Sequence, residues 1–294
     1  MKKVSPLLQL ENPKGFATLD EKLHTGQAGT CDLFIHACEG SMTFSLLERS
    51  SGKFLAAENI LEAPESKSTF AAFLRQSIQD SQLFSLKYHQ HCTIAVSNSF
   101  ATLVPSGLLK QGDEYRFLQL SVSRDDLTAG SSKVNGFDLQ VAFGIQPEIR
   151  SLLQQLLPNA KILHGLPSQL DYHWMNAAST KGHFATVCAY PGLLTVIVSE
   201  GKKLIFANSF LPRDTDEAVY YLLNVCEQLE LDRSIIPMEL YGTTYTCEAL
   251  QARLQQYVSN LHATKSIGFA EISYKLKELP AAALLPALVI SLCE

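Results

Sequence analysis

The order of the elements constrains the fold of this chain most, because one order occurs twice. Three strand-like segments, a helix and a further strand follow one another in the first half, and the series returns from residue 183. Turn chemistry separates the strands in both halves, at residues 39–41 and again at residues 190–192. Such a chain is predicted to be an α/β protein with two related halves. The strands are predicted over residues 33–37, 42–48, 53–59, 184–189, 193–198 and 203–207.

Each set of three strands is followed by an amphipathic helix and then by a strand. In the first half, Phe70, Leu74 and Ile78 share one face of a helix predicted over residues 66–83, and a strand over residues 92–96 follows. The match between the halves therefore extends beyond the strands.

The second half repeats this pattern with a clear helix start. Asp214 precedes a helix predicted from Thr215, and Glu217 follows at the spacing of a capping box. A strand over residues 238–241 then ends at Gly242. The turn at residues 97–99, which ends the last strand of the first half, aligns with residues 242–244.

The length of 294 residues and the 46% of apolar residues are enough for two globular domains. We predict a loose N-terminal extension over residues 1–30, a first domain over residues 31–165 and a second domain over residues 166–294. Polar segments are predicted as solvated loops at residues 113–116 and 124–136. The remaining elements are strands at 137–143 and 160–163, helices at 147–157, 167–178 and 248–261, a short strand at 267–272 and an apolar core run at 280–292.

Composition excludes several classes of protein. The net charge of −5 and the lack of a dense Lys and Arg run argue against nucleic acid as a partner. The seven cysteines are an odd number without a CxxC pair, which favours reduced thiols and a cytoplasmic location. No signal peptide is read at the N-terminus, and residues 280–292 are too few to span a bilayer. No metal site and no catalytic residue are predicted.

The duplicated meander, helix and strand resemble the actin-like ATPase architecture, a ribonuclease H-like arrangement in which each domain holds a mixed sheet and flanking helices. Actin, sugar kinases, large heat-shock chaperones and the actin-like pilus assembly protein share it. A second resemblance is carried by residues 32–47, 100–105, 204–210, 220–223 and 293–294. In these segments the chain is similar to the bacterial domain-of-unknown-function family 3822, largely from Bacteroidetes. That family implies the actin-like fold and no specific activity.

The resemblance also implies where a nucleotide would bind. In actin-like ATPases the first hairpin of each half carries a phosphate loop, and a Gly-rich turn in the second half holds adenosine. Backbone N–H groups approach the phosphates, and a carboxylate at the end of the first strand holds the hydrated metal. The matching positions of this chain are Glu39, Gly40, Ser41, Thr43, Gly192, Gly242 and Thr243.

Both phosphate loops lack groups that this chemistry needs. His36 or Ala37 stands where the first carboxylate is expected, and Glu39 belongs to the turn itself. In the second loop Pro191 removes a backbone N–H, and Gly192 is the single glycine. We therefore predict a pseudo-ATPase that needs no cofactor and acts by binding another protein or its own copy, through the cleft or an exposed sheet edge.

Two other interpretations remain open from the sequence. The chain would be an ATP-binding or ATP-hydrolysing enzyme if ATP and magnesium met an unusual site at Glu39, Ser41, Thr43 and Gly242. A hydrolase on a doubly wound sheet is disfavoured, because no nucleophile elbow occurs. For the first interpretation, we expect Tyr190 and His36 to fill the cleft between the two turns.

Overall fold

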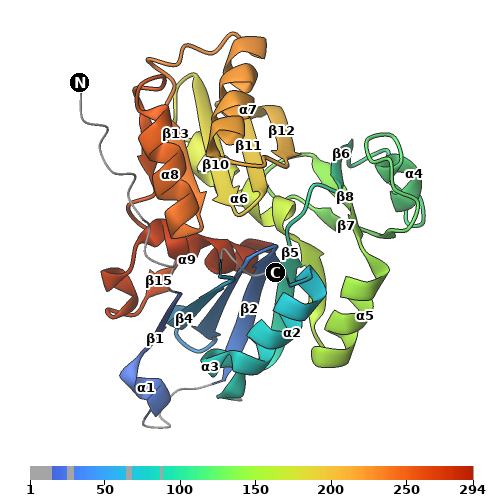
Figure 1. The fold of residues 1–294 in the computed structure, drawn as a ribbon, viewed down its shortest axis with the longest axis vertical. Helices are drawn as coiled ribbons and strands as arrows, with labels where there is room; N and C mark the ends of the chain where they lie inside the picture. The colour runs from blue at the N-terminus through green and yellow to red at the C-terminus, as the bar shows by residue number, and fades with distance from the viewer. Residues whose placement is uncertain (1–14, 25–29, 64–67, 87–88, 294) are drawn as a thin grey trace, which may run out of the picture.

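The computed structural model describes residues 15–24, 30–63, 68–86 and 89–293, and most strands lie in two large sheets (Figure 1). The first sheet has the order β1-β4-β3-β2-β5-β9, with β15 also paired to β4. Its central strand β2 is buried along its whole length, as expected for a strand with both faces covered. The strands are β1 Phe16–Leu19, β2 Cys31–Cys38, β3 Ser41–Glu48, β4 Lys53–Leu61, β5 His89–Val96, β9 Lys161–His164 and β15 Glu271–Ile272.

The second sheet has the order β12-β11-β10-β13-β14. Its three-strand meander is antiparallel and its last two strands run parallel to β10, which is also the arrangement of β4-β3-β2-β5-β9 in the first sheet. All six predicted meander strands are confirmed. The strands of this sheet are β10 His183–Tyr190, β11 Leu193–Glu200, β12 Lys203–Phe210, β13 Met238–Gly242 and β14 Leu261–Ala263.

A third, smaller sheet lies to one side of the molecule (Figure 1). It has the order β6-β8-β7, with β6 at Ala101–Pro105, β7 at Thr128–Lys133 and β8 at Leu139–Ile145, and it carries helix α4 at Glu114–Leu118. The loops predicted at residues 113–116 and 124–136 are therefore wrong over α4 and β7. Small polar side chains make β7 look like a loop, and antiparallel pairing with β8 makes it a strand.

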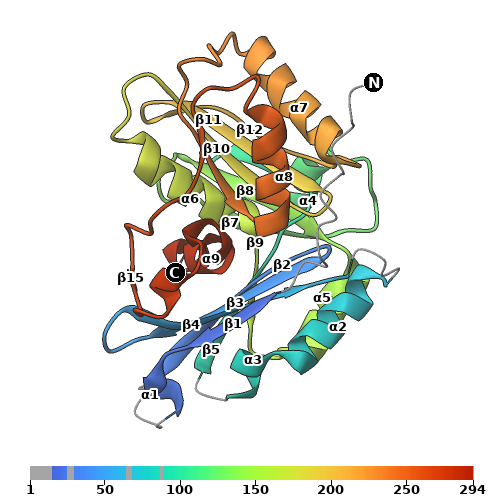
Figure 2. The same cartoon turned by 60° about the vertical axis from the view of Figure 1, so that its left-hand side comes forward.

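Helices cover both large sheets in layers. In Figure 2, α2, α3 and α5 lie on one face of the first sheet, whereas α6 and α9 lie between the two sheets. Helices α7 and α8 pack on the other face of the second sheet through an apolar core. The helices are α1 Glu21–His24, α2 Phe70–Asp80, α3 Gln82–Ser85, α5 Pro147–Leu156, α6 Gly165–Ala177, α7 Thr215–Gln228, α8 Thr244–Leu254 and α9 Ala281–Leu288, with short 3-10 helices at Leu276–Glu278 and Val289–Cys293.

Segments from both ends of the chain depart from the predicted domains. Residues 1–30 are not all a loose extension, because β1 pairs with residues 56–59 of β4; residues 1–14 and 25–29 lie outside the described residues. At the other end β15 pairs with β4, so part of the segment predicted as a second domain belongs to the first sheet. The boundary at residue 165 stays a prediction.

Two further expectations concern the C-terminal half. The helix predicted over residues 248–261 begins at Thr244 and ends at Leu254, and residue 261 starts a strand instead. The apolar run at 280–292 forms α9 and a 3-10 helix that pack in the core. Within the described ranges, no helix has both the length and the apolar character to cross a membrane.

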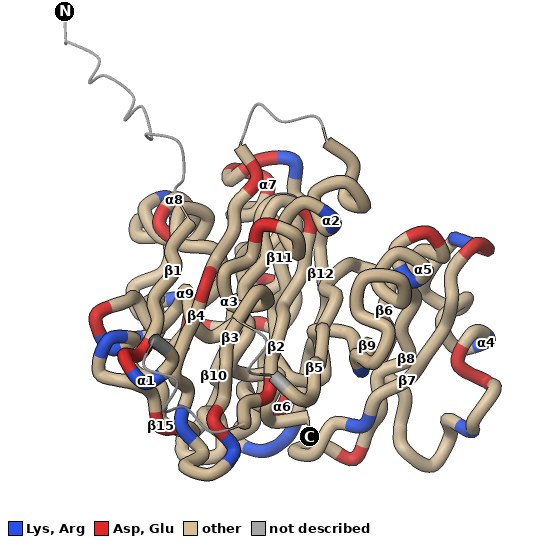
Figure 3. The backbone as a smooth tube through the Cα atoms, turned by 90° about the horizontal axis from the view of Figure 1, so that it is seen from below, with Lys and Arg blue, Asp and Glu red and all other residues tan. Residues whose placement is uncertain are grey.

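Charged residues lie mainly in turns and helices, and the central strands carry few of them (Figure 3). This distribution follows from the burial of β2 and β10, whose side chains pack between layers.

Candidate functional site

The two predicted phosphate turns are in direct contact. Gly40, in the turn between β2 and β3, has φ of +73°, and Gly192 in the turn between β10 and β11 has φ of +63°. A Cβ atom at Gly40 would lie 3.2 Å from the Cβ of Pro191. Pro191 therefore packs against the first turn, beside a cavity of about 190 Å³ that Glu39 and Gly192 line.

Two aromatic rings close the space behind the turns. The rings of His36 on β2 and Tyr190 on β10 stack with centroids 4.7 Å apart and an interplanar angle of 29°. Each residue is only 2% exposed. The two rings are thus packed together, and the hypothesis that they narrow or fill a nucleotide cleft stays a prediction.

His36 is held as a neutral ring. Burial, with a smaller contribution from nearby His164, lowers the pKa of His36 to about 3. Its Nε2 lies 2.9 Å from the hydroxyl of Ser97, while Nδ1 has no hydrogen-bond partner among the described residues. Because the ring under Tyr190 is neutral, it offers no positive charge that could attract a phosphate.

Other groups around the stack are also uncharged. Cys38, Cys188, Tyr190 and Tyr241 belong to one buried cluster between the sheets. Burial raises the pKa of Cys188 to about 12 and raises the pKa of Tyr190 and Tyr241 well above their ordinary values. Thiols and phenols in this state are poor nucleophiles at neutral pH. We call His36, Cys38, Cys188, Tyr190 and Tyr241 the inter-sheet cluster.

The hydroxyls of Ser41 and Thr43 are hydrogen-bonded within the chain. The side-chain amide of Asn59 on β4 donates to Thr43 Oγ1 at 3.0 Å, to Ser41 Oγ at 3.3 Å and to the carbonyl oxygen of Met42 at 3.1 Å. Ser41 and Thr43 are 2% and 1% exposed. Neither hydroxyl is available to a magnesium ion or a phosphate in this arrangement.

Glu39 is the one member of the first turn that faces solvent. It lines a cavity of about 190 Å³ together with Asn98, Arg124 and Pro191. Arg124 is already paired with Asp126 at 2.7 Å and lies over the ring of Phe100. Glu39 is thus the single carboxylate in the lining of this cavity, and the other side-chain oxygens of the lining belong to Ser97, Asn98, Ser99 and Gln146.

Gly242 and Thr243 end strand β13 against β10. Gly242 has φ of +141°, and a Cβ atom there would overlap the carbonyl oxygen of Ala189. The N–H of Thr243 donates to the same carbonyl oxygen at 2.9 Å. The close approach of the two strands therefore requires a glycine at position 242. This packing explains the glycine without any role in binding adenosine.

A second cavity of about 370 Å³ lies on the other side of the second turn. Pro191 and Gly192 line both cavities, and Tyr245 and Thr246 at the start of α8 line only this one. The first turn of α8 has no side-chain cap, so its N–H groups are the site's best donors for an anion. In the described part of the chain, no group of three His, Cys, Asp or Glu residues is arranged to hold a metal ion.

The turn after β5 supports the cluster in a way that sequence reasoning missed. The backbone N–H of Leu166 donates to His164 Nδ1 at 3.1 Å, so Nε2 carries the proton and donates to Asn98 Oδ1 at 3.2 Å. A Cβ atom at Gly165 would overlap the hydroxyl of Ser97. The only signal in the sequence is the polar run 97–99 at the end of a strand.

The comparisons with known proteins agree with this architecture. A family model described as "Protein of unknown function (DUF3822)" matches residues 20–261. The chain belongs to this family. No curated protein matches the sequence.

Solved structures extend the likeness of this family member to almost the whole chain. A protein from Bacteroides thetaiotaomicron VPI-5482, with an actin-like ATPase fold and unknown function, is 16% identical with a TM-score of 0.72, over 92% of this chain and 98% of that chain. A structure of the PilM–PilN type IV pilus biogenesis complex is 13% identical with a TM-score of 0.58, over 90% and 98%. At these identities the likeness shows the fold alone, and the predicted actin-like fold is confirmed.

Proposed function

We propose that this protein is a non-catalytic member of the actin-like fold that acts by binding another protein. The observation that carries the proposal is the contact between the two turns, in which Pro191 covers Gly40 and Tyr190 stacks on His36. A triphosphate would have to separate these groups and expose a buried aromatic pair to enter.

Few groups near the turns could bind a triphosphate or its magnesium ion strongly enough to offset this separation. The ends of β2 and β10 carry Cys38 and Tyr190 rather than carboxylates, and burial keeps both uncharged. The hydroxyls of Ser41 and Thr43 are bonded to Asn59. Magnesium takes oxygen ligands in octahedral geometry, and in the lining of the 190 Å³ cavity between the turns Glu39 is the single carboxylate.

The outer edge of β12 is the surface that we propose for the partner. In the described residues β12 pairs only with β11, and none of its residues is fully buried. The N–H of Ser209 donates to the side chain of Asn208, so it points away from β11, and Ala207 shares that direction by alternation. An edge of this kind accepts an extended segment of another chain by strand addition.

Aromatic side chains stand next to this edge. Phe206 and Phe210 stack at 6.4 Å, Phe210 and Tyr221 stack at 4.8 Å, and Tyr220 beside them is 62% exposed. Exposed aromatic residues are enriched at protein interfaces. One structurally similar chain comes from the PilM–PilN type IV pilus biogenesis complex, which supports a protein partner for this fold.

A photo-reactive residue at Asn208 tests the edge directly. We expect a defined cross-linked adduct in cells of the source organism, and we expect Ala207→Pro to abolish it by removing an outward N–H. The same photo-reactive residue at Lys181, which is exposed elsewhere in the second half, is the matched control. Identical adducts at both positions, or an adduct that survives Ala207→Pro, would count against the edge.

ATP hydrolysis tests the absence of catalysis. We expect no phosphate release above buffer and no rise in melting temperature with ATP and magnesium. Turnover that is lost in both Glu39→Ala and Thr43→Val, with unchanged melting temperatures, would contradict the proposal.

The alternative is a nucleotide-binding protein. It is favoured by one observation, the 370 Å³ cavity beside the uncapped start of α8, where the hydroxyls of Thr243 and Thr246 have no partner among the described residues. Adenosine without phosphates would fit this cavity while the turns stay in contact. Saturable binding of adenosine that is lost in Thr246→Val would support it.

We also infer that the two halves arose by duplication and that the protein works in the cytoplasm. The common strand order of the two large sheets supports duplication. Seven unpaired cysteines support a reducing compartment.

A further inference from the structure

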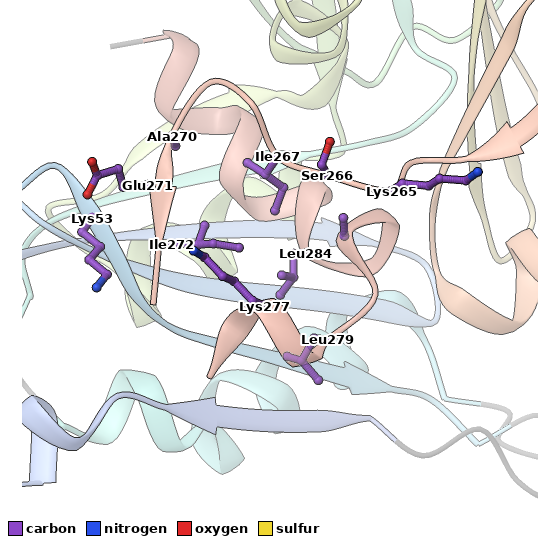
Figure 4. A pocket seen from close by; sticks show the side chains of 11 residues that line it. Lys53, Lys265, Ser266, Ile267, Ala270, Glu271, Ile272, Lys277, Leu279 and Leu284 are labelled. Carbon is purple, nitrogen blue, oxygen red and sulfur yellow. The ribbon is translucent and has the colours of Figure 1, made fainter. Parts of the chain in front are cut away.

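A further cavity lies beside β15 (Figure 4), and Ile267 of its lining packs against the apolar cluster that holds Cys38, Cys188, Tyr190 and Tyr241. Its volume is about 520 Å³, which is within the range of small-molecule sites. Two segments near the C-terminus enclose it, residues 265–272 and 277–284, and Lys53 at the start of β4 completes the wall. Neither turn of the nucleotide-like site contributes to it.

Three lysines line this cavity, although the chain as a whole carries a net charge of −5. In the described part of the chain, Lys53, Lys265 and Lys277 make no ion pair or side-chain hydrogen bond. Glu271 is the single acidic residue of the lining and lies opposite Lys53 in the β15–β4 register, without an ion pair to it. Lys265 points away from the apolar middle of the cavity (Figure 4), so Lys53, Lys277 and Glu271 leave a net charge of +1 there (two Lys, one Glu), which favours an anion.

The middle of the cavity is apolar. Ile267, Leu279 and Leu284 line it; Leu284 is fully buried, and Ile267 and Leu279 are half-buried. In Figure 4 these side chains lie between Lys265 on one side and Lys53 with Lys277 on the other, and Lys265 points away from them. The ligand must therefore present an apolar body to the middle and a negative group to Lys53 and Lys277.

We propose that this cavity binds a small amphipathic anion, with an alkyl body over Ile267, Leu279 and Leu284 and a carboxylate or phosphate head at Lys53 and Lys277. Lysine ammonium groups act as point charges and take either head group. The apolar lining offers a sugar or a nucleobase few hydrogen-bond partners, since Ser266 is the only uncharged polar side chain in it. The inference is independent of the proposed protein partner.

Isothermal titration with decanoate, below the concentration at which it forms micelles, tests the proposal on the full chain. We expect saturable binding of one molecule per chain that weakens with added salt. The double variant Lys53→Gln, Lys277→Gln should raise Kd at least tenfold, and so should Leu279→Asp. The double variant Lys110→Gln, Lys181→Gln removes two exposed lysines elsewhere and should leave Kd unchanged. Melting temperatures verify that each variant is folded.

Two further probes identify the source of the anion. Decanol has the chain without the charge and should bind at least tenfold more weakly than decanoate. Preference for decyl phosphate over decanoate would assign a phosphorylated amphiphile, and the reverse a fatty acid. Equal affinity for decanol, an unchanged Kd in the Lys53 and Lys277 double variant, or binding only to vesicles of phosphatidylglycerol would overturn the proposal.

Discussion

Strands β4 and β12 occupy the same place in the two large sheets, but their outer edges differ. The edge of β4 is covered by β1 at residues 56–59 and by β15 at residues 53–54. The edge of β12 has no strand on it in the described residues. As a consequence β4 is buried over most of its length, whereas β12 alternates between exposed and half-buried residues.

The difference indicates which sheet has an edge strand that another chain can pair with. Two short segments near the ends of the chain pair with β4. The first sheet therefore leaves few backbone N–H and C=O groups of β4 free to pair with another chain. An uncovered edge usually carries protection against unwanted pairing. Here β12 has an irregularity near Ile205, opposite Val198 and Ser199, which restricts regular pairing to the part after it. The second sheet therefore presents a short, defined edge.

The largest difference in stability is expected where the parallel strands end. Gly242 lies beside Ala189, and Val96 lies beside Ala37 in the same register of the first sheet. Gly242→Ala should lower the free energy of unfolding by about 4 kcal/mol, because its Cβ would overlap a carbonyl oxygen at an unfavourable φ. Gly192→Ala, with open space at its Cβ, should cost about 1 kcal/mol. Urea denaturation measures both, and equal losses would show that the turn and the strand end are equally constrained.

Proline substitutions test directly whether the edge of β4 is covered and the edge of β12 is open. The N–H of Asp20 donates to β4, and by alternation so does that of Thr18. Thr18→Pro should therefore cost about 3 kcal/mol, and Ala207→Pro on β12 about 1 kcal/mol or less. Thermal unfolding of the two variants is the measurement. A larger loss for Ala207→Pro would mean that the edge of β12 is already covered.

Three buried histidines, His36 on β2, His164 on β9 and His173 on α6, give a pH test. His173 is bonded through both ring nitrogens to Thr186 and Ser199, whereas His36 has one partner. Burial lowers the pKa of His36 and His173 to about 3 and that of His164 to about 4, from 6.5. The unfolded chain binds these protons first, so stability is full above pH 6.5 and falls as the pH drops toward 4.

Each buried histidine contributes about 1.4 kcal/mol per pH unit in that range. His36→Phe keeps a ring against Tyr190 and should reduce the slope of unfolding free energy against pH by this amount. The slope is measured by urea denaturation between pH 5 and pH 6.5, the upper limit being the ordinary histidine pKa. An unchanged slope would show that His36 is not buried as a neutral ring.

The smallest expected effect concerns the helices that follow the two meanders. Asp214 caps α7 by accepting from the N–H of Glu217 at 2.8 Å, and Thr69 caps α2 by accepting from that of Ala72 at 3.2 Å. Asp214→Ala and Thr69→Ala should each lower stability by about 1 kcal/mol. Differential scanning calorimetry compares them, and no change in either would show that the caps form without stabilising the helices.

The sequence alone predicts the elements that carry strong patterns. The six meander strands and the Asp214 cap follow from turn residues and periodicity. Strand β1 escapes prediction because its four residues are too few to show alternation, and β15 falls within the strand predicted at 267–272, whose pairing with β4 the sequence does not indicate. Strand β7 escapes for a different reason, since its small polar residues favour a turn until β8 pairs with them.

The site was predictable to a similar degree. A tyrosine and a proline in a phosphate loop are sufficient to expect side chains between the turns, and the stack of His36 and Tyr190 agrees with this expectation. The bonds from Asn59 to Ser41 and Thr43 were not predictable, because they depend on the register of β3 against β4. Whether a nucleotide meets any of the predicted residues stays a prediction.

Isothermal titration of ATP and magnesium into the wild-type protein tests the central claim most directly. We predict no binding heat at millimolar ATP, because Pro191 and the stack of Tyr190 on His36 occupy the space between the turns. Tyr190→Ala removes one of these obstacles and should still show none, since no carboxylate ends β2 or β10. Micromolar binding by the wild type that disappears in Glu39→Ala, at an unchanged melting temperature, would contradict the account.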